Sequence, residues 1–340
     1  MIRYYAEKND AGFRNQAYSI ADDFRTNGDY ELAEYIVSVL SGMNSFVPQE
    51  TDNGTVYTYL RKVEYSNEPL PLPEVIKEDI TGIINAVNYN AGINKFLFQG
   101  GPGTGKTATA KQVARILMRN LFVVDFETII DSKLGQTSKN IIELFREINH
   151  MNNPYNAIIL FDEIDALVMN RLNSNDLREM GRATSSFLKG FDELNDNVIV
   201  IATTNLYQEF DKALVRRFDA VIDFNRYNSD DLEKIAVILL NNFLPSFPYA
   251  KQNTRLFRKI IRLMNPIPMP GELKNQIKTA LAFGNPQNPY SYLTKLYCNL
   301  ENANLGDMSA MKKQGFTVRD IEALTGVSKS KVSRATRGTE

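Results

Sequence analysis

Cysteine and histidine are almost missing from this 340-residue sequence, which has one of each, Cys298 and His150. A single cysteine excludes an intrachain disulfide, and such a composition is typical of proteins in a reducing cytoplasm. His150 falls where a helical pattern ends. We therefore expect it to contact the end of that helix rather than to take part in catalysis.

The sequence also lacks an excess of charge and long apolar runs. Lysine and arginine number 39, and aspartate and glutamate number 40, which gives a net charge of −1. Without a global field, any binding to nucleic acid or to a membrane surface must be local. No apolar run approaches the roughly 18 residues of a membrane helix, and the first residues lack the apolar core of a signal peptide. We expect a cytoplasmic protein of two or three domains that does not contact membranes.

A glycine-rich stretch from Gly100 to Thr107 separates an apolar run from a helical pattern and matches the phosphate-binding motif G-x-x-x-x-G-K-[ST]. Glycines leave the backbone N–H groups free to contact phosphate, and the helix that starts near Gly105 adds its partial positive charge. Lys106 supplies a full charge for the outer phosphates, and the hydroxyl of Thr107 is suited to ligate Mg²⁺. The predicted nucleotide-binding residues are Gly101, Pro102, Gly103, Thr104, Gly105, Lys106, Thr107 and Ala108.

Two carboxylates follow the most apolar predicted strand, residues 157–161. Ligands of parallel sheets bind beyond the carboxyl ends of the strands, where Asp162 and Glu163 would meet the glycine-rich stretch. We expect Asp162 to hold Mg²⁺ or its bound water, and Glu163 to polarise the attacking water as general base. The alternative is that both residues cap the next helix.

An amide and two arginines follow in the sequence. Asn205 comes after the predicted strand 198–203, where its side chain would reach the γ-phosphate or the attacking water; the alternative is a turn-forming asparagine. Arg216 and Arg217 precede another predicted strand. Arginine is always ionised and forms bidentate contacts, which suits the charge that develops on a phosphoryl group. A solvated charged face is the alternative, and the spacing does not say whose nucleotide the arginines contact.

Strand and helix patterns alternate from about residue 75, which predicts an α/β fold with a parallel sheet and helices on both of its faces. We divide the chain into an N-terminal helical region, a large ATPase domain, a helical lid and a tail, at residues 1–66, 67–227, 228–290 and 291–340. Residues 13–41 read as a helical hairpin. It resembles tetratricopeptide-like and microtubule-interacting-and-trafficking-like hairpins, and it is either a plain helical cap or a module that binds a partner or substrate.

Four motifs in order resemble an AAA+ ATPase of the katanin, spastin and fidgetin type, over about residues 75–285. They are Gly101–Thr107, Leu160–Asp165, Ala202–Asn205 and Leu214–Asp219. The resemblance implies a P-loop NTPase fold, Mg²⁺-dependent hydrolysis of ATP to ADP and phosphate, and a ring homo-oligomer, usually a hexamer. It also implies that Asn205 is a sensor of the γ-phosphate and that Arg216 and Arg217 act on the ATP of the neighbouring subunit.

Two further segments extend this resemblance. Residues 132–141 resemble a pore loop and its following helix, but Lys133 and Leu134 stand where many remodelling ATPases carry an aromatic residue. In the lid, Gly271 matches a helix start that packs on adenine, and Lys274 is the candidate there for a second sensor. The departure at the pore loop leaves the gripping of a threaded polypeptide open.

The tail reads as two helices, 318–324 and 329–337, with an N-cap at Thr317 and a tight turn at Gly326. It resembles the helix-turn-helix of resolvases and invertases. Residues 311–340 hold seven lysines and arginines against three acidic residues, in a chain whose net charge is −1. We expect either binding of duplex DNA, with polar side chains on base edges and cations on phosphates, or a small helical bundle that packs on the lid or on a partner.

The sequence thus predicts an ATP-driven ring that remodels a protein or protein–DNA target. One alternative is an ATP-dependent, recombination-associated regulator bound to DNA through its helix-turn-helix. The other is a scaffold without catalysis, which the presence of both Lys106 and Glu163 argues against.

Overall fold

The structure is a computed structural model, and the chain divides into two compact units, residues 1–57 and 58–340. The structure describes residues 16–20, 57–64, 70–130, 136–165, 177–209 and 212–337. In the first unit, residues 16–20 are helical, and the rest of the predicted hairpin lies outside the described residues. The predicted pore-loop residues Lys133 and Leu134 also lie outside them.

The second unit contains a six-stranded sheet in the order β1-β3-β4-β5-β2-β6. The strands are β1 (Leu60–Val63), β2 (Lys95–Gln99), β3 (Asn120–Val124), β4 (Ala157–Phe161), β5 (Ile199–Thr204) and β6 (Ala220–Asp223). Strands β2 to β6 pair in parallel, whereas β1 pairs with β3 in the antiparallel direction. The sheet is therefore mixed rather than wholly parallel. Because β1 covers the edge of β3, the sheet begins before residue 66, where we placed the end of the N-terminal region.

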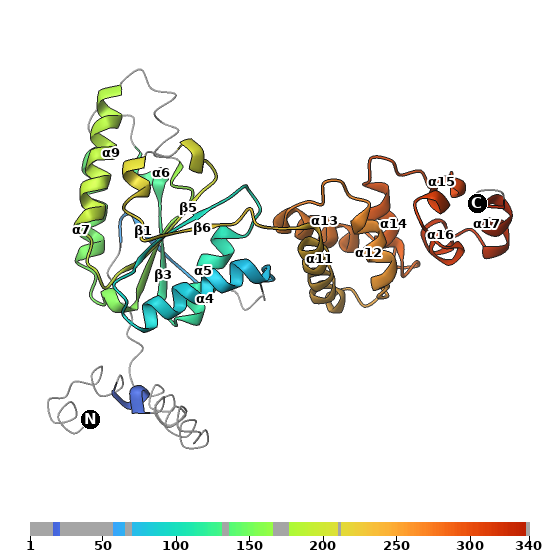
Figure 1. Cartoon of the computed structure of the whole chain (residues 1–340), viewed down its shortest axis with the longest axis horizontal. Coiled ribbons are helices and arrows are strands. Elements are labelled where there is room, and N and C mark those ends of the chain that lie inside the picture. The colour runs from blue at the N-terminus through green and yellow to red at the C-terminus, as the bar shows by residue number, and fades with distance from the viewer. Residues whose placement is uncertain are drawn as a thin grey trace. The chain divides into compact units, whose positions relative to one another are not determined.

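Helices cover both faces of this sheet, with α4 and α5 on one side and α7 and α9 on the other (Figure 1). The helices of this part are α4 (Glu74–Asn88), α5 (Lys106–Ile116), α6 (Phe126–Ile129), α7 (Gln136–Asn149), α9 (Leu177–Asp192) and α10 (Lys212–Val215). All five residues of β4 are buried. Ile158 and Leu160 share a core with α4 and α5, while the ring of Phe161 packs on Phe145 of α7 and Phe187 of α9. The near-continuous apolar strands thus reflect burial on both faces.

A helical lid and the tail follow β6. Their helices are α11 (Ser229–Phe243), α12 (Thr254–Arg262), α13 (Pro270–Ala282), α14 (Ser291–Cys298), α15 (Met308–Lys313), α16 (Val318–Thr325) and α17 (Lys329–Ala335). Buried residues from all seven helices belong to one hydrophobic core. The boundary that we placed at residue 290 therefore does not separate two cores, since α14 contributes Leu293 and Leu296 to the shared one.

The last helices of the tail pack on α12 of the lid and on α14, the first helix of the tail, through three kinds of contact. The rings of Tyr297 and Phe316 meet edge to face, with centroids 5.5 Å apart. The hydroxyl of Thr294 donates a hydrogen bond to the carbonyl of Leu324 at 2.9 Å. An ion pair joins Lys259 of α12 to Asp320 of α16 at 2.7 Å. Packing of the tail on the lid, one of the two interpretations of its sequence, is thus present in the structure.

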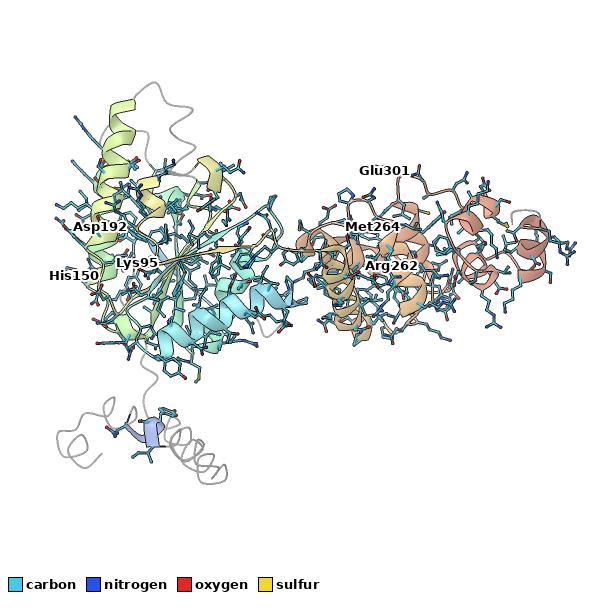
Figure 2. All side chains as sticks on the ribbon, in the orientation of Figure 1. Lys95, His150, Asp192, Arg262, Met264 and Glu301 are labelled. Atoms are coloured by element: carbon cyan, nitrogen blue, oxygen red, sulfur yellow. The ribbon has the colours of Figure 1, made fainter. Side chains whose placement is uncertain are left out.

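Two smaller expectations can also be compared with the structure. The Nδ1 atom of His150 lies 2.8 Å from the carbonyl oxygen of Arg146, at the end of α7 (Figure 2), so the histidine makes the helix-end contact that we predicted. Thr317 caps α16 and forms a capping box with Asp320, and Gly326 adopts the left-handed conformation in the turn after it.

Within the described residues, no helix is long and apolar enough to cross a membrane.

Candidate active site

The glycine-rich stretch forms a loop between the end of β2 and the start of α5. Gly103 and Gly105 have φ angles of 74° and 97°, in the left-handed region that side chains other than glycine rarely adopt. At Gly100, an added Cβ would lie 2.9 Å from the Cβ of Phe224. Glycine is therefore required in this loop by backbone conformation and by a close neighbour, as expected for a cradle that binds phosphate through N–H groups.

Lys106 lies inside this loop and is only 7% exposed. Its ammonium group donates to the carbonyl oxygens of Gly100 and Gly101 at 2.7 and 2.8 Å, and to Oδ1 of Asn205 at 2.8 Å. Burial lowers the pKa of the Lys106 amine, and the nearby carboxylates of Asp165, Asp162 and Glu163 oppose that shift. The structure thus brings together two residues predicted to contact the outer phosphates.

Three oxygen-bearing side chains meet at the end of β4. The hydroxyls of Thr107 and Thr203 donate to Oδ1 of Asp162 at 2.7 and 2.8 Å. Hydroxyl and carboxylate oxygens are the ligands that Mg²⁺ prefers, usually together with waters and substrate phosphates. Thr107 and Asp162, which come from α5 and the end of β4, therefore fit the predicted magnesium site.

Glu163 sits beside this cluster in an unusual backbone conformation, with a φ of 52°. Its N–H donates to the hydroxyl of Thr203 at 2.8 Å, which fixes the turn after β4. The side chain is exposed and lines the same cavity as Lys106, Thr107 and Asn205. A left-handed residue that is not glycine costs about 1–3 kcal/mol and tends to occur at functional sites.

Asp165 supports the site, and sequence reasoning gave it no role. It is 6% exposed, and its carboxylate accepts hydrogen bonds from the hydroxyl of Thr204 and, at 2.7 Å, from the N–H of Asn205. These contacts tie the turn after β4 to the turn after β5 and hold Asn205 in position. The signal was present in the sequence, as a third carboxylate two residues after Glu163.

The site opens into a cavity of about 800 Å³, which is large enough for a nucleotide. Leu70 and Pro71, which precede α4, line it together with Leu239 and Phe243 of α11 and Gly271 of α13. Apolar residues from two sides suit the faces of an adenine base. Lys274, the other lid residue that the sequence singled out, also lines the cavity.

The two predicted arginines do not line this cavity. Arg217 forms a bidentate ion pair with Asp192, at 2.7 Å from Nε and 2.9 Å from Nη2, and donates through Nη1 to the carbonyl of Ala213 at 2.7 Å. Figure 2 shows Asp192 and Lys95 in the same part of the sheet domain. Arg216 is exposed, and no described residue forms a hydrogen bond or ion pair with its side chain.

The comparison with protein families agrees with this geometry. Residues 96–226 match the family described as ATPase family associated with various cellular activities (AAA). Residues 96–226 are thus similar to an AAA ATPase domain. The matched residues run from β2 through the phosphate loop and both arginines to the segment that follows β6.

Curated relatives of this AAA ATPase domain include other ATPases. An uncharacterized AAA family ATPase of Sinorhizobium fredii, y4kL, is 33% identical over 163 residues, which cover 48% of each chain. Spastin of Drosophila willistoni is 30% identical over 250 residues, which cover 72% of this chain and 29% of spastin. The chain thus spans about half or less of the length of these relatives. Their similarity supports ATP hydrolysis by the AAA domain.

Among solved structures, a chain of the Escherichia coli MS115-1 HORMA:CdnC:Trip13 complex shares the fold. The match has a TM-score of 0.57 and 17% sequence identity, and it covers 70% of this chain and 94% of the other. At this identity the similarity extends to the fold alone.

Proposed function

We propose that the chain couples hydrolysis of Mg²⁺-ATP to remodelling of a protein or protein–DNA target, as part of a ring of identical subunits. The observation that carries the proposal is that two pairs of side chains lie next to each other at the same glycine-rich loop. Lys106 contacts Asn205, and Thr107 contacts Asp162, while Glu163 lines the same cavity. These are the parts that phosphoryl transfer requires: charge on the outer phosphates, a metal site and a base.

Each residue has a role that its position supports. The loop N–H groups and Lys106 bind the phosphates, and the carboxylate of Glu163 accepts a proton from the water that attacks the γ-phosphorus. Asn205 hydrogen-bonds the γ-phosphate or that water, with its position set by Asp165. Thr107 and Asp162 would hold Mg²⁺, which when bound neutralises charge on the β- and γ-phosphates. Leu70, Phe243 and Gly271 surround the adenine.

The ring is part of the proposal because the site is incomplete within one subunit. No arginine among the residues described by the structure lines the cavity, although hydrolysis of this type commonly uses an arginine from outside the nucleotide site. Arg216 is exposed and Arg217 neighbours it, so an adjacent subunit could present one or both to the γ-phosphate. A hexamer is the usual assembly of the type that the sequence resembles.

The test compares the ATPase rates of the wild-type chain, Lys106→Ala and Glu163→Gln. Lys106→Ala should lose nucleotide binding. Glu163→Gln should bind Mg²⁺-ATP but lose turnover by about 10²- to 10⁴-fold, the usual contribution of a general base. Glu193→Gln is the matched control, because Glu193 is an exposed carboxylate and does not line the cavity. Retained turnover in Glu163→Gln would exclude Glu163 as the base. Native mass spectrometry of Glu163→Gln with Mg²⁺-ATP tests the ring, and a monomer at all concentrations would refute it.

A second candidate function is that of an ATP-dependent regulator bound to duplex DNA. The observation that favours it is the exposed face of α17, the helix that follows the turn at Gly326. Lys331 and Arg334 of α17 are exposed, as is Arg337 just after the helix, and no described residue pairs with their side chains. Val332 anchors the opposite face in the lid core. An exposed basic helix held by an apolar anchor suits contact with DNA phosphates.

Fluorescence anisotropy with a labelled DNA duplex tests this second function. The double variant Lys331→Ala, Arg334→Ala should weaken binding and lower the slope of affinity against salt by about two, because each phosphate contact releases one counterion. The control removes two exposed cations elsewhere, Arg146 and Lys189, which are 65% and 76% exposed. Equal losses in both double variants would indicate non-specific attraction, and no binding by the wild-type chain would refute the DNA function.

A further inference from the structure

The segment between β6 and α11 lies against the phosphate loop. It runs from Phe224, which is fully buried beside Gly100, to the start of the lid. Within it, the ring of Tyr227 packs both on the core that contains the sheet and on the core of the lid. Tyr227 is therefore in contact with both parts that enclose the nucleotide cavity.

Three hydrogen bonds connect this segment and the lid to the phosphate loop. The hydroxyl of Tyr227 donates to the carbonyl oxygen of Thr104 at 2.7 Å. The N–H of Gly271 donates to the carbonyl oxygen of Gly103 at 2.8 Å. The side-chain oxygen of Asn225 accepts from the N–H of Gly101 at 2.9 Å. Two successive carbonyl groups of the loop are thus held by donors from outside it.

The direction of these carbonyls decides the direction of the N–H groups that bind phosphate. In a planar trans peptide, the C=O of one residue and the N–H of the next point to opposite sides. Holding the carbonyl of Thr104 toward Tyr227 therefore turns the N–H of Gly105 away from Tyr227. In the same way, the hydrogen bond from Gly271 to the carbonyl of Gly103 turns the N–H of Thr104 away from Gly271. Gly103 and Gly105 have no side chains to restrain the adjoining peptide planes. Hydrogen bonds from outside the loop can therefore set the orientation of these peptides.

The phenol of Tyr227 is suited to this task at any ordinary pH. Burial raises the pKa of Tyr227 far above its usual value, and the nearby carboxylate of Asp231 raises it further. The hydroxyl thus remains protonated and remains a donor. Its acceptor is well fixed, because Thr104 is fully buried and its own hydroxyl donates to the carbonyl of Gly101 at 2.8 Å.

We propose that Tyr227 is a positioning residue for nucleotide binding: its hydroxyl orients the peptide between Thr104 and Gly105 so that the loop presents its N–H groups to the phosphates. This rests on the proposed function of the site as an ATPase centre. Because the ring of Tyr227 also packs on the lid, the orientation of the loop depends on the position of the lid. The adenine side of the cavity does not depend on this hydroxyl.

The variant Tyr227→Phe removes the hydroxyl and keeps the ring. For the full-length chain, calorimetry should show Mg²⁺-ADP binding about 3- to 10-fold weaker, the effect of one net hydrogen bond. The KM for ATP should rise by a similar factor, with kcat within about twofold, because the loop holds the phosphates equally in the ground state and the transition state.

Tyr292→Phe is the matched control. The hydroxyl of Tyr292 donates to the carbonyl of Lys251 at 3.0 Å, so this variant also removes a hydrogen bond from a phenol to a backbone carbonyl, but between α14 and the lid rather than at the phosphate loop. Its affinity for Mg²⁺-ADP should equal that of the wild type. Unchanged affinity in Tyr227→Phe, or an equal loss in Tyr292→Phe, would overturn the inference while the ATPase proposal stands. A wild-type chain that binds no Mg²⁺-ADP would overturn both.

Discussion

Arg216 and Arg217 are adjacent in sequence, yet they have different surroundings in the structure. Arg217 is held in its own subunit by Asp192 and by the carbonyl of Ala213. Arg216 is exposed. To contact the ATP of a neighbour, Arg217 would first have to break a bidentate ion pair, whereas Arg216 would lose only its hydration. Within the ring that we propose, this difference favours Arg216 over Arg217 as the arginine that would act on the ATP of a neighbour.

This difference predicts distinct phenotypes for the two alanine variants. Arg216→Ala should lose about 10³-fold or more in ATPase rate, as is typical for loss of an arginine finger, without a change in melting temperature. When it is mixed with Lys106→Ala subunits, activity should return in part, because each variant then supplies what the other lacks. The measurement is the ATPase rate across mixing ratios. No recovery at any ratio would contradict action between subunits.

Arg217→Ala serves as the comparison, because it removes the bidentate ion pair with Asp192 and one hydrogen bond to the carbonyl of Ala213. We expect a lower melting temperature together with reduced activity. If Arg217→Ala were instead as stable as the wild type and equally rescued by Lys106→Ala, the two arginines would share the role that the sequence resemblance implies.

At the scale of elements, the approach of α13 to the phosphate loop allows no side chain at residue 271. An added Cβ on Gly271 would lie 2.9 Å from Cα and 3.0 Å from the carbonyl oxygen of Gly103, and backbone atoms cannot move aside as a flexible side chain can. Gly271→Ala should therefore push the lid away and weaken Mg²⁺-ADP binding roughly tenfold or more, since overpacking costs about 1–3 kcal/mol.

The control for this substitution is Gly82→Ala, within α4, where an added Cβ meets no atom within 4 Å. In a helix interior, alanine is favoured over glycine by about 0.5–1 kcal/mol. Gly82→Ala should thus raise the melting temperature slightly and leave nucleotide affinity unchanged. Equal affinities for Gly271→Ala and Gly82→Ala, measured by calorimetry, would show that the close approach does not control binding.

Much of the nucleotide site could be predicted from the sequence because its parts are local. The loop residues, Asp162 with Glu163, and Asn205 each stand directly after an apolar strand, and parallel strands bring their carboxyl ends together. Contacts between distant segments could not be predicted in this way. Asn225 is 124 residues from its partner Gly101, and Tyr227 is 123 residues from Thr104, and nothing near either pair in the sequence signals the contact.

The same division applies to the fold. Alternating strand and helix patterns predicted a sheet with helices on both faces. The positions of the predicted strands agree with those of β2, β4 and β5 in the structure. The place and direction of β1 could not be predicted, because four residues, Leu60–Val63, do not encode which edge they join. Likewise, the sequence pattern located α16 but not α14 (Ser291–Cys298), and it gave no indication that the two helices share one core.

The attachment of α16 to the lid predicts a stability that depends on pH. Burial alone raises the pKa of Asp320, but hydrogen bonds from Lys259 and Thr317 outweigh it, so its pKa lies below the ordinary 3.8. A carboxyl with a lowered folded-state pKa stabilises the protein above its unfolded-state pKa, and this stabilisation is lost as pH falls through the folded value. Asp320→Asn should lower the free energy of unfolding by about 1–3 kcal/mol at pH 7.

At pH 3 and below, the difference between Asp320→Asn and the wild type should shrink. Urea unfolding followed by circular dichroism at both pH values measures it. An equal difference at pH 7 and at low pH would mean that the ion pair with Lys259 is not its source.

At the scale of the whole second unit, the lid connects the nucleotide site to the tail. Gly271 of the lid bonds to the phosphate loop, while Met311, Phe316, Leu324 and Val332 of the tail belong to the lid core. Because α17 shares the core of the lid, a change in lid position on nucleotide binding would carry α17 with it. If α17 binds DNA, we expect the two ligands to be coupled through this shared core.

Such coupling is reciprocal by thermodynamic necessity. Saturating Mg²⁺-ADP should change the affinity for a DNA duplex by about fivefold or more, the lower end of common allosteric effects, and saturating DNA should change the affinity for Mg²⁺-ADP by the same factor. Anisotropy and calorimetry measure the two sides. Gly271→Ala should reduce both factors toward one, because it separates the lid from the phosphate loop. DNA binding that is tight but indifferent to nucleotide would show that the tail acts only as a tether, and that lid movement does not reach α17.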